Sequence, residues 1–194
     1  MRLGTWVWMH GQITMLIVIL MLLSIPDVRH YPYLAFSVAA IISLWPVMGT
    51  GLDVASCLLP TIGFFSCSSL ILIALAVGNL LQWGIRISSF ELNLLLGVAS
   101  ILGPVLHATA SGWTSFNLYT LGFTSVMLAL GVGMIAAGAW IGDFKLIAIL
   151  MLTALWAWLL NLGESQNLWD YLLDPWLVLY AAYHNASVLI THTT

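Results

Sequence analysis

The sequence predicts an all-α fold, a polytopic integral membrane helical bundle with six transmembrane helices and a C-terminal interfacial or seventh helix. Hydrophobic residues make up 62% of the 194 residues and charged residues only 6%, whereas about 25% of the residues in soluble domains are charged. The mean hydropathy of +1.07 agrees with this class. Apolar stretches recur at about the 20-residue length that a membrane-crossing helix needs. The lipid bilayer is therefore the first expected partner.

Six apolar stretches account for the predicted spans. In chain order they are Thr5 to Ile25, Tyr33 to Met48, Val54 to Leu81, Leu92 to Ser111, Tyr119 to Ile141 and Phe144 to Leu160. The second stretch is short and carries Pro46 near its end, so a kink or a continuation towards Leu52 is expected. Because no polar linker or internal repeat divides the chain, residues 1–194 are expected to form a single membrane domain.

The segment from Glu164 to His192 allows two interpretations. It is rich in tryptophan and tyrosine and has two aspartates and a proline in its first part. Aromatic, amphipathic segments of this kind lie along the membrane interface as helices. The alternative is a seventh span from about Pro175 to Ile190, which is shorter than the usual length. The aromatic content favours the interfacial helix, and the seventh span stays open.

The few basic residues predict the orientation. Arg29, Arg86 and Lys145 fall in the first, third and fifth loops, while Arg2 falls on the other side. Because cytoplasmic loops carry the excess of lysine and arginine, the odd loops are expected in the cytoplasm and the N-terminus outside. The formal net charge of −3 is small and spread along the chain, so no nucleic-acid partner is expected.

Two aspartates stand out as candidates for chemistry. Asp27 and Asp143 each lie at the end of a predicted span, and each is followed two residues later by a base, Arg29 or Lys145. Two carboxyl groups held close together share a proton, and such a pair activates water for attack on a peptide carbonyl. The alternative is that both are loop residues, paired with their neighbouring bases at the membrane surface.

Residues 142–146 (GDFKL) and 24–32 (SIPDVRHYP) resemble the two aspartate motifs of the type IV prepilin peptidases, membrane aspartic proteases of the GxGD class. The resemblance implies that Asp27 and Asp143 are the catalytic pair, supported by Arg29 and Lys145, with Gly142 allowing close backbone approach. It also implies cleavage of pilin-like leader peptides at the cytoplasmic face of a bacterial inner membrane. A rival alignment places the first motif at residues 83–86, which lack the aspartate, and would make the chain a non-catalytic relative.

A second class of function is a non-catalytic integral membrane subunit of a larger secretion, conjugation or respiratory assembly. Four small residues, Ala129, Gly133, Ala137 and Gly138, recur at helical spacing along the fifth predicted span. Small residues let a second helix approach closely. Packing within this chain and packing against another subunit both explain such a pattern.

The sequence predicts no cofactor and no metal site. Haem held between helices needs two axial histidines at comparable depth, and His10 and His107 are the only plausible pair. Structural or interfacial histidines are the preferred interpretation. Cys57 and Cys67 lack a metal-binding spacing and are expected to be buried, inert thiols.

Overall fold

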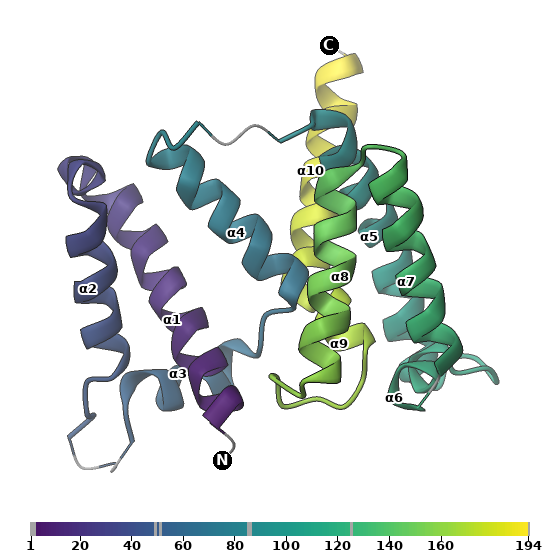
Figure 1. Cartoon of the computed structure of the whole chain (residues 1–194), viewed down its shortest axis with the longest axis horizontal. Coiled ribbons are helices and arrows are strands. Elements are labelled where there is room, and N and C mark those ends of the chain that lie inside the picture. The colour runs from purple at the N-terminus through teal and green to yellow at the C-terminus, as the bar shows by residue number, and fades with distance from the viewer. Residues whose placement is uncertain (1–2, 49, 51, 85–86, 125, 194) are drawn as a thin grey trace. The chain divides into compact units, whose positions relative to one another are not determined.

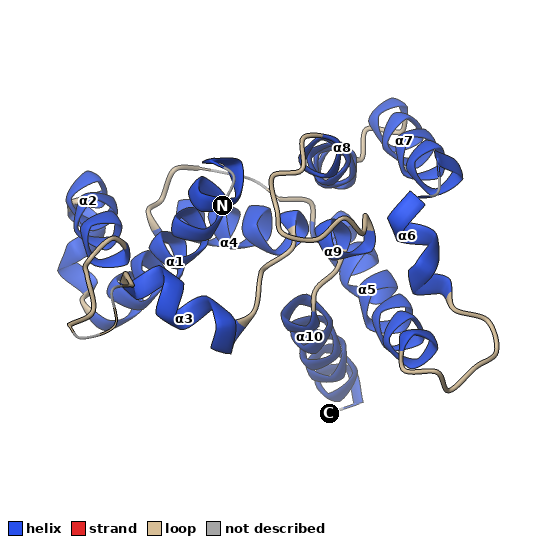
Figure 2. Ribbon diagram, turned by 90° about the horizontal axis from the view of Figure 1, so that it is seen from below, coloured by secondary structure: helices blue, strands red, loops and turns tan. Residues whose placement is uncertain are grey.

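The computed structural model describes residues 3–48, 50, 52–84, 87–124 and 126–193, and the named elements within those ranges are all helices (Figures 1 and 2). The all-α prediction is thereby confirmed for the described part of the chain. The contacts divide the chain into two compact units, Met1–Phe64 with Leu70–Ile85, and Phe65–Ser69 with Arg86–Thr194. Each unit is described by itself, and the expectation of a single membrane domain stays a prediction.

The elements comprise long helices and short helical turns. In chain order they are α1 (Leu3–Ser24), η1 (Pro26–His30), α2 (Pro32–Ser43), α3 (Val54–Ile62), α4 (Cys67–Leu80), α5 (Ser89–Ala110), η2 (Leu118–Thr120), α6 (Leu121–Thr124), α7 (Val126–Ile141), α8 (Lys145–Leu159), α9 (Trp169–Leu172) and α10 (Pro175–Thr193).

The first unit is organised around α1, which packs against both α2 and α3. One apolar cluster joins α1 to α3 and consists of Met9, Ile13, Ala55 and Leu59. A second cluster, of Val18, Leu22, Ala39 and Val77, joins α1 to α2 and α4. The α1 members recur at four-residue intervals within each cluster, as expected for one face of a helix.

The prediction of one continuous helix from Val54 to Leu81 is wrong. Residues 63–66 separate α3 from α4 and have no helical conformation. Gly63 has a φ of +82°, a left-handed conformation that ends a helix and that glycine adopts at little cost. A new helix then begins after Ser66, whose Oγ accepts a hydrogen bond from the Ser69 amide at 3.1 Å. Hydropathy alone did not reveal this break, because the separating residues are themselves apolar or small.

Two described helices are long and apolar enough to cross a membrane, Thr5–Ser24 and Ser89–Ala110. Four shorter apolar helices coincide with other predicted spans: Pro32–Ser43, Cys67–Leu80, Val126–Ile141 and Lys145–Leu159. A 16-residue helix such as α7 is roughly 24 Å long, against a hydrocarbon core of about 30 Å. The six-span topology therefore stays a prediction. Its orientation does too, and two of the bases used for it, Arg2 and Arg86, lie outside the described residues.

The second unit contains two antiparallel helix pairs. α7 and α8 form a hairpin (Figure 1), and α10 packs along α5. At one end of the α5–α10 pair, Gly103 meets Val178. Further along, Asn185 donates hydrogen bonds to the Leu96 carbonyl at 3.3 Å and to Ser100 Oγ at 2.8 Å. The sequence left the α10 segment open between an interfacial helix and a span, and in the structure it is a helix of 19 residues.

Candidate functional site

Asp143 forms the turn between α7 and α8. Its φ is +65°, a left-handed conformation that glycine, asparagine and aspartate tolerate best. The Phe144 amide donates to the Ala139 carbonyl at 2.8 Å, and the Asp143 amide donates to the Trp140 carbonyl at 3.3 Å. This pair of hydrogen bonds is the Schellman motif, with Asp143 at the position where glycine is usual. Asp143 therefore ends α7 by its backbone conformation.

The Asp143 carboxylate is 87% exposed and lies 3.1 Å from Lys145 Nζ. The same ammonium group donates to the Trp140 carbonyl at 3.2 Å and lies 4.3 Å from the centre of the Trp140 ring. Lys145 thus stabilises the exposed end of α7 through a charge, a hydrogen bond and a cation–π contact. A Cβ on Gly142 would lie 3.1 Å from the Phe144 ring, so a larger residue there requires that ring to shift.

The buried carboxylate near this turn is Glu91, which is not among the predicted site residues. Glu91 lies in the first turn of α5 and is 6% exposed. Its Oε2 accepts hydrogen bonds from the Leu146 amide at 2.8 Å and the Ile147 amide at 3.2 Å. These amides belong to the first turn of α8, where backbone donors have no partner within the helix. Glu91 therefore caps α8 across the interface between α5 and α8.

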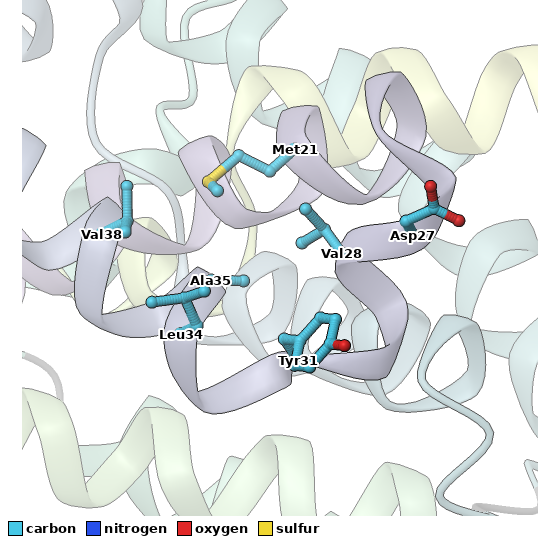
Figure 3. A pocket seen from close by; sticks show the side chains of 7 residues that line it. All are labelled: Met21, Asp27, Val28, Tyr31, Leu34, Ala35 and Val38. Atoms are coloured by element: carbon cyan, nitrogen blue, oxygen red, sulfur yellow. The ribbon is translucent and has the colours of Figure 1, made fainter.

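Asp27 lies in η1, directly after α1, and is exposed. It lines the edge of a hollow of about 170 Å³ whose other lining residues are mainly apolar, and its carboxyl group points away from those side chains (Figure 3). A second hollow of about 360 Å³ brings Asp27 together with Arg29 and His30 and the residues at the end of α4. Arg29 Nε also donates to the Leu22 carbonyl at 3.4 Å, so Arg29 supports the end of α1.

The two predicted catalytic aspartates belong to different units, Asp27 to the first and Asp143 to the second. Each is described within its own unit, and their pairing stays a prediction. The histidines considered for haem are divided in the same way, since His10 belongs to the first unit and His107, which is exposed, to the second.

The residues of α7 differ in how deeply they are buried. Val132, Ala136 and Ala139 are the buried positions of the helix. Gly133 is half-buried, and a Cβ there would lie 3.9 Å from Leu155 Cδ2 of α8. The predicted packing residues Ala137 and Gly138 are exposed, and a Cβ on Gly138 would meet nothing within 4 Å among the described residues. Ala129 is half-buried, like Gly133.

His10 is buried in the first unit beside Asp53, the residue that caps α3. Its Nε2 lies 3.5 Å from Asp53 Oδ2, and its side chain is 8% exposed. The other carboxylate oxygen of Asp53 accepts a hydrogen bond from the Ser56 amide at 2.8 Å. Partial burial raises the pKa of Asp53, but the Ser56 hydrogen bonds and the electrostatic interaction with His10 outweigh it, so the pKa lies below its ordinary value. Asp53 is therefore negatively charged at neutral pH.

Asp174 is a buried carboxylate of the second unit and is 4% exposed. Both of its oxygens accept hydrogen bonds. Its Oδ1 accepts a hydrogen bond from the Leu177 amide at 2.8 Å and so caps α10. Its Oδ2 accepts from the Ser66 amide at 2.7 Å and from the Ser69 hydroxyl. One carboxylate therefore holds the beginnings of both α10 and α4.

A further polar cluster surrounds Asn167, which is fully buried. Its Nδ2 donates to the Tyr119 carbonyl at 2.9 Å, and its Oδ1 accepts from the Trp169 amide at 3.0 Å. The Tyr119 hydroxyl donates to both oxygens of Asp170 at 2.9 Å. The Tyr119 hydroxyl therefore links η2 to α9 through the Asp170 carboxylate.

Two of the buried carboxylates that were not predicted as site residues do have local sequence signals. Ser88 and Glu91 follow the S-x-x-E spacing of a helix start, and Asp174 precedes Pro175, a common first residue of a helix. Neither signal indicates which distant helix the carboxylate also binds.

No family model matches this chain, and no curated protein or solved structure matches it either.

Proposed function

We propose that the chain is a non-catalytic integral membrane subunit of a larger membrane assembly. The observation that carries the proposal is the use of the carboxylates in the second unit. Glu91 binds the start of α8, Asp174 binds the starts of α4 and α10, and Asp170 binds Tyr119. Glu91 and Asp174 hold helix ends, and Asp170 holds a tyrosine hydroxyl, so all three carboxylates are engaged in structural contacts.

The break between α3 and α4 supports a membrane setting for this scaffold. Non-helical backbone at membrane depth is tolerated only where protein groups satisfy its hydrogen bonds. The Ser66 amide, at the end of the break, donates to the buried Asp174 carboxylate at 2.7 Å. α10 follows α5 closely, from Gly103 and Val178 at one end to Asn93 and His184, whose Oδ1 and Nε2 lie 3.0 Å apart. If α5 spans the membrane, α10 lies beside it and spans the membrane as well. The packing of α10 along α5 therefore favours a seventh span over an interfacial helix.

The outward side of α7 is the surface that this proposal assigns to a partner subunit. It is rich in large exposed apolar side chains: Val126, Met127, Leu130, Met134, Ile135 and Ile141. Gly138 and Ala137 lie among them, and Gly138 has free space where its Cβ would be. Glycine costs roughly 1 kcal/mol in a helix relative to alanine, and packing among the described residues of the second unit does not explain its presence at this position. A helix of another subunit approaching Gly138 does explain it.

Replacing Gly138 with leucine is expected to release the chain from its assembly while leaving its own fold intact. A tagged chain, expressed from its own gene and extracted in a mild detergent, should migrate as a particle several times larger than its 21.2 kDa. Gly138→Leu should reduce the fraction in that particle by about tenfold, equivalent to about 1.4 kcal/mol of association. Native gel electrophoresis and analytical ultracentrifugation measure the size of the particle and the fraction of the chain that it contains.

Gly133→Leu is the matched control, because the added side chain would push α7 away from Leu155 of α8. It should lower the stability of the chain itself by about 1–3 kcal/mol, whereas Gly138→Leu should not. A wild-type chain that migrates alone, with no other polypeptide in fixed ratio, contradicts the subunit proposal.

The second candidate is the leader-peptide protease that the motif resemblance suggests. The observation that favours it is the exposure of Asp27 at the end of α1, beside Arg29 and His30 around the larger hollow. A carboxylate in that position is open to a basic peptide and to water.

Variants of Asp27 and Asp143 distinguish a protease function from a purely structural role in the turn between α7 and α8. For a catalytic pair, Asp27→Asn, Asp143→Asn and Asp143→Gly should each abolish cleavage of a co-expressed prepilin, because none retains the carboxyl group that exchanges the proton. For a turn role, Asp143→Gly should leave thermal stability unchanged or raise it, since glycine fits the left-handed position. Unchanged cleavage in all three variants would exclude the dyad.

A further inference from the structure

The larger hollow beside η1 brings an acid and a base of the first unit together without pairing them. It lies between Asp27, Arg29 and His30 of η1 and residues 80–82 at the end of α4. The ion pairs found among the described residues include neither Asp27 nor Arg29. Arg29 donates through Nε to the Leu22 carbonyl, and its two terminal nitrogens have no partner among the described residues. Both charges at the hollow are therefore available to a ligand.

The hollow lies at the end of a candidate membrane span. Thr5–Ser24 is one of the two described helices that are long and apolar enough to cross a membrane, and η1 follows it directly. Three aromatic side chains of η1, α2 and the end of α4 are exposed close by in the chain: Tyr31, Tyr33 and Trp83. Tyrosine and tryptophan gather at the level of lipid headgroups. With α1 as a span, the hollow lies at headgroup depth.

Apolar surface adjoins the charged hollow. Asp27 also borders the smaller hollow of about 170 Å³, whose lining includes Met21, Leu34 and Val38. The Asp27 carboxyl group points away from these apolar side chains (Figure 3). One residue therefore lies where a charged hollow and an apolar hollow meet, an arrangement that suits a ligand with a charged end and a hydrocarbon end.

We propose that the larger hollow binds the headgroup of a phospholipid with a primary ammonium group, of the phosphatidylethanolamine class, and that one acyl chain lies along the smaller hollow. The Arg29 guanidinium offers parallel N–H donors to the phosphate, and the ring N–H of His30 adds another. The Asp27 carboxylate accepts hydrogen bonds from the ammonium group. α1 and α4 both end beside this hollow, and the negative end of a helix dipole also favours a cation.

Charge complementarity selects this headgroup over two others. Phosphatidylglycerol has the phosphate for Arg29 but places an uncharged diol beside Asp27, which leaves the carboxylate without a cation. A basic peptide matches Asp27, but Arg29 repels it and the apolar hollow stays unused. The lipid site depends on neither candidate function, because it requires neither the surface of α7 nor the pairing of Asp27 with Asp143.

Native mass spectrometry of the full-length chain in a mild detergent tests the site. The chain is mixed with equal amounts of phosphatidylethanolamine and phosphatidylglycerol that have the same acyl chains, and the two one-lipid complexes are compared. The wild type should retain phosphatidylethanolamine over phosphatidylglycerol by about tenfold, the factor that one charge-assisted hydrogen bond gives. Asp27→Asn should bring the ratio close to one. Arg29→Gln should reduce the retention of both lipids, whereas Arg29→Lys, which keeps the cation, should restore most of it.

Asp143→Asn is the matched control for Asp27→Asn. Asp143 is also an exposed acid two residues before a base, but it is already paired with Lys145 at 3.1 Å and belongs to the second unit. This variant should keep the wild-type ratio. Free phosphoethanolamine in excess should not displace the lipid, because it has no acyl chain for the apolar hollow. Equal retention of the two lipids by the wild type overturns the proposal. A preference that persists in Asp27→Asn, or displacement by free phosphoethanolamine, overturns it too.

Discussion

Replacing Asp174 with alanine is expected to lower the free energy of unfolding by about 3–5 kcal/mol, because each buried donor left without an acceptor costs about 1–3 kcal/mol. Three donors lose their partner at once: the Ser66 amide, the Leu177 amide and the Ser69 hydroxyl. Reversible unfolding of the detergent-solubilised chain, followed by circular dichroism during titration with a denaturing detergent, measures the change.

Asp143→Asn is the matched control for this prediction. Asparagine also fits the left-handed conformation of residue 143, so the variant removes only the exposed carboxylate charge opposite Lys145, and exposed ion pairs contribute about 0–1 kcal/mol. Asp174→Asn should fall between the two, because one oxygen remains to accept from the Leu177 amide. If Asp174→Ala and Asp143→Asn had equally small effects, Asp174 would not secure residues 66–69 against the start of α10.

Gly103→Ala is expected to separate α5 from α10 and to lower the free energy of unfolding by about 1–3 kcal/mol, as overpacked cores do. A Cβ on Gly103 would overlap Cγ1 and Cγ2 of Val178, a buried side chain of α10. Valine is branched at Cβ and has little freedom to turn away. The backbones of the two helices must therefore move apart. The same unfolding titration measures this effect.

Gly97→Ala provides the control on the same helix. A Cβ at Gly97 would meet nothing within 4 Å among the described residues, and alanine is the better helix former, so stability should stay unchanged or rise by up to about 1 kcal/mol. Combining Gly103→Ala with Val178→Ala should restore part of the loss by making room. A destabilising Gly97→Ala together with a neutral Gly103→Ala would contradict the packing of α5 against α10.

The helical class was predictable because it depends on composition and on the lengths of apolar stretches. Residues 144–160 illustrate this, since α8 begins and ends within one residue of the predicted span. Local helix endings were harder to predict. The break at Gly63 lies within an apolar stretch, and one left-handed glycine decides it. Hydropathy averaged over about 20 residues cannot detect a single backbone angle.

The roles of the acidic residues were less predictable than the helices. Asp143 drew attention because it follows a span and precedes a lysine, and both features also describe a helix-ending turn. Glu91 and Asp174 drew none, although their side chains are buried. Their importance comes from backbone amides 55 and 108 residues away in the chain, and the sequence does not encode such partners in any local pattern.

The bonds of Asp174 also impose an order on biosynthesis. Ser66 and Asp174 are separated by 108 residues, so a ribosome releases the start of α4 long before it makes the acceptor for the Ser66 amide. At synthesis rates of about 5–20 residues per second, that delay lasts roughly 5–20 s. During this interval the start of α4 has its local Ser66 cap but lacks the Asp174 carboxylate. A chain that ends before residue 174 never forms the hydrogen bond between the Ser66 amide and Asp174. The last part translated therefore decides whether the start of α4, made much earlier, is held in place.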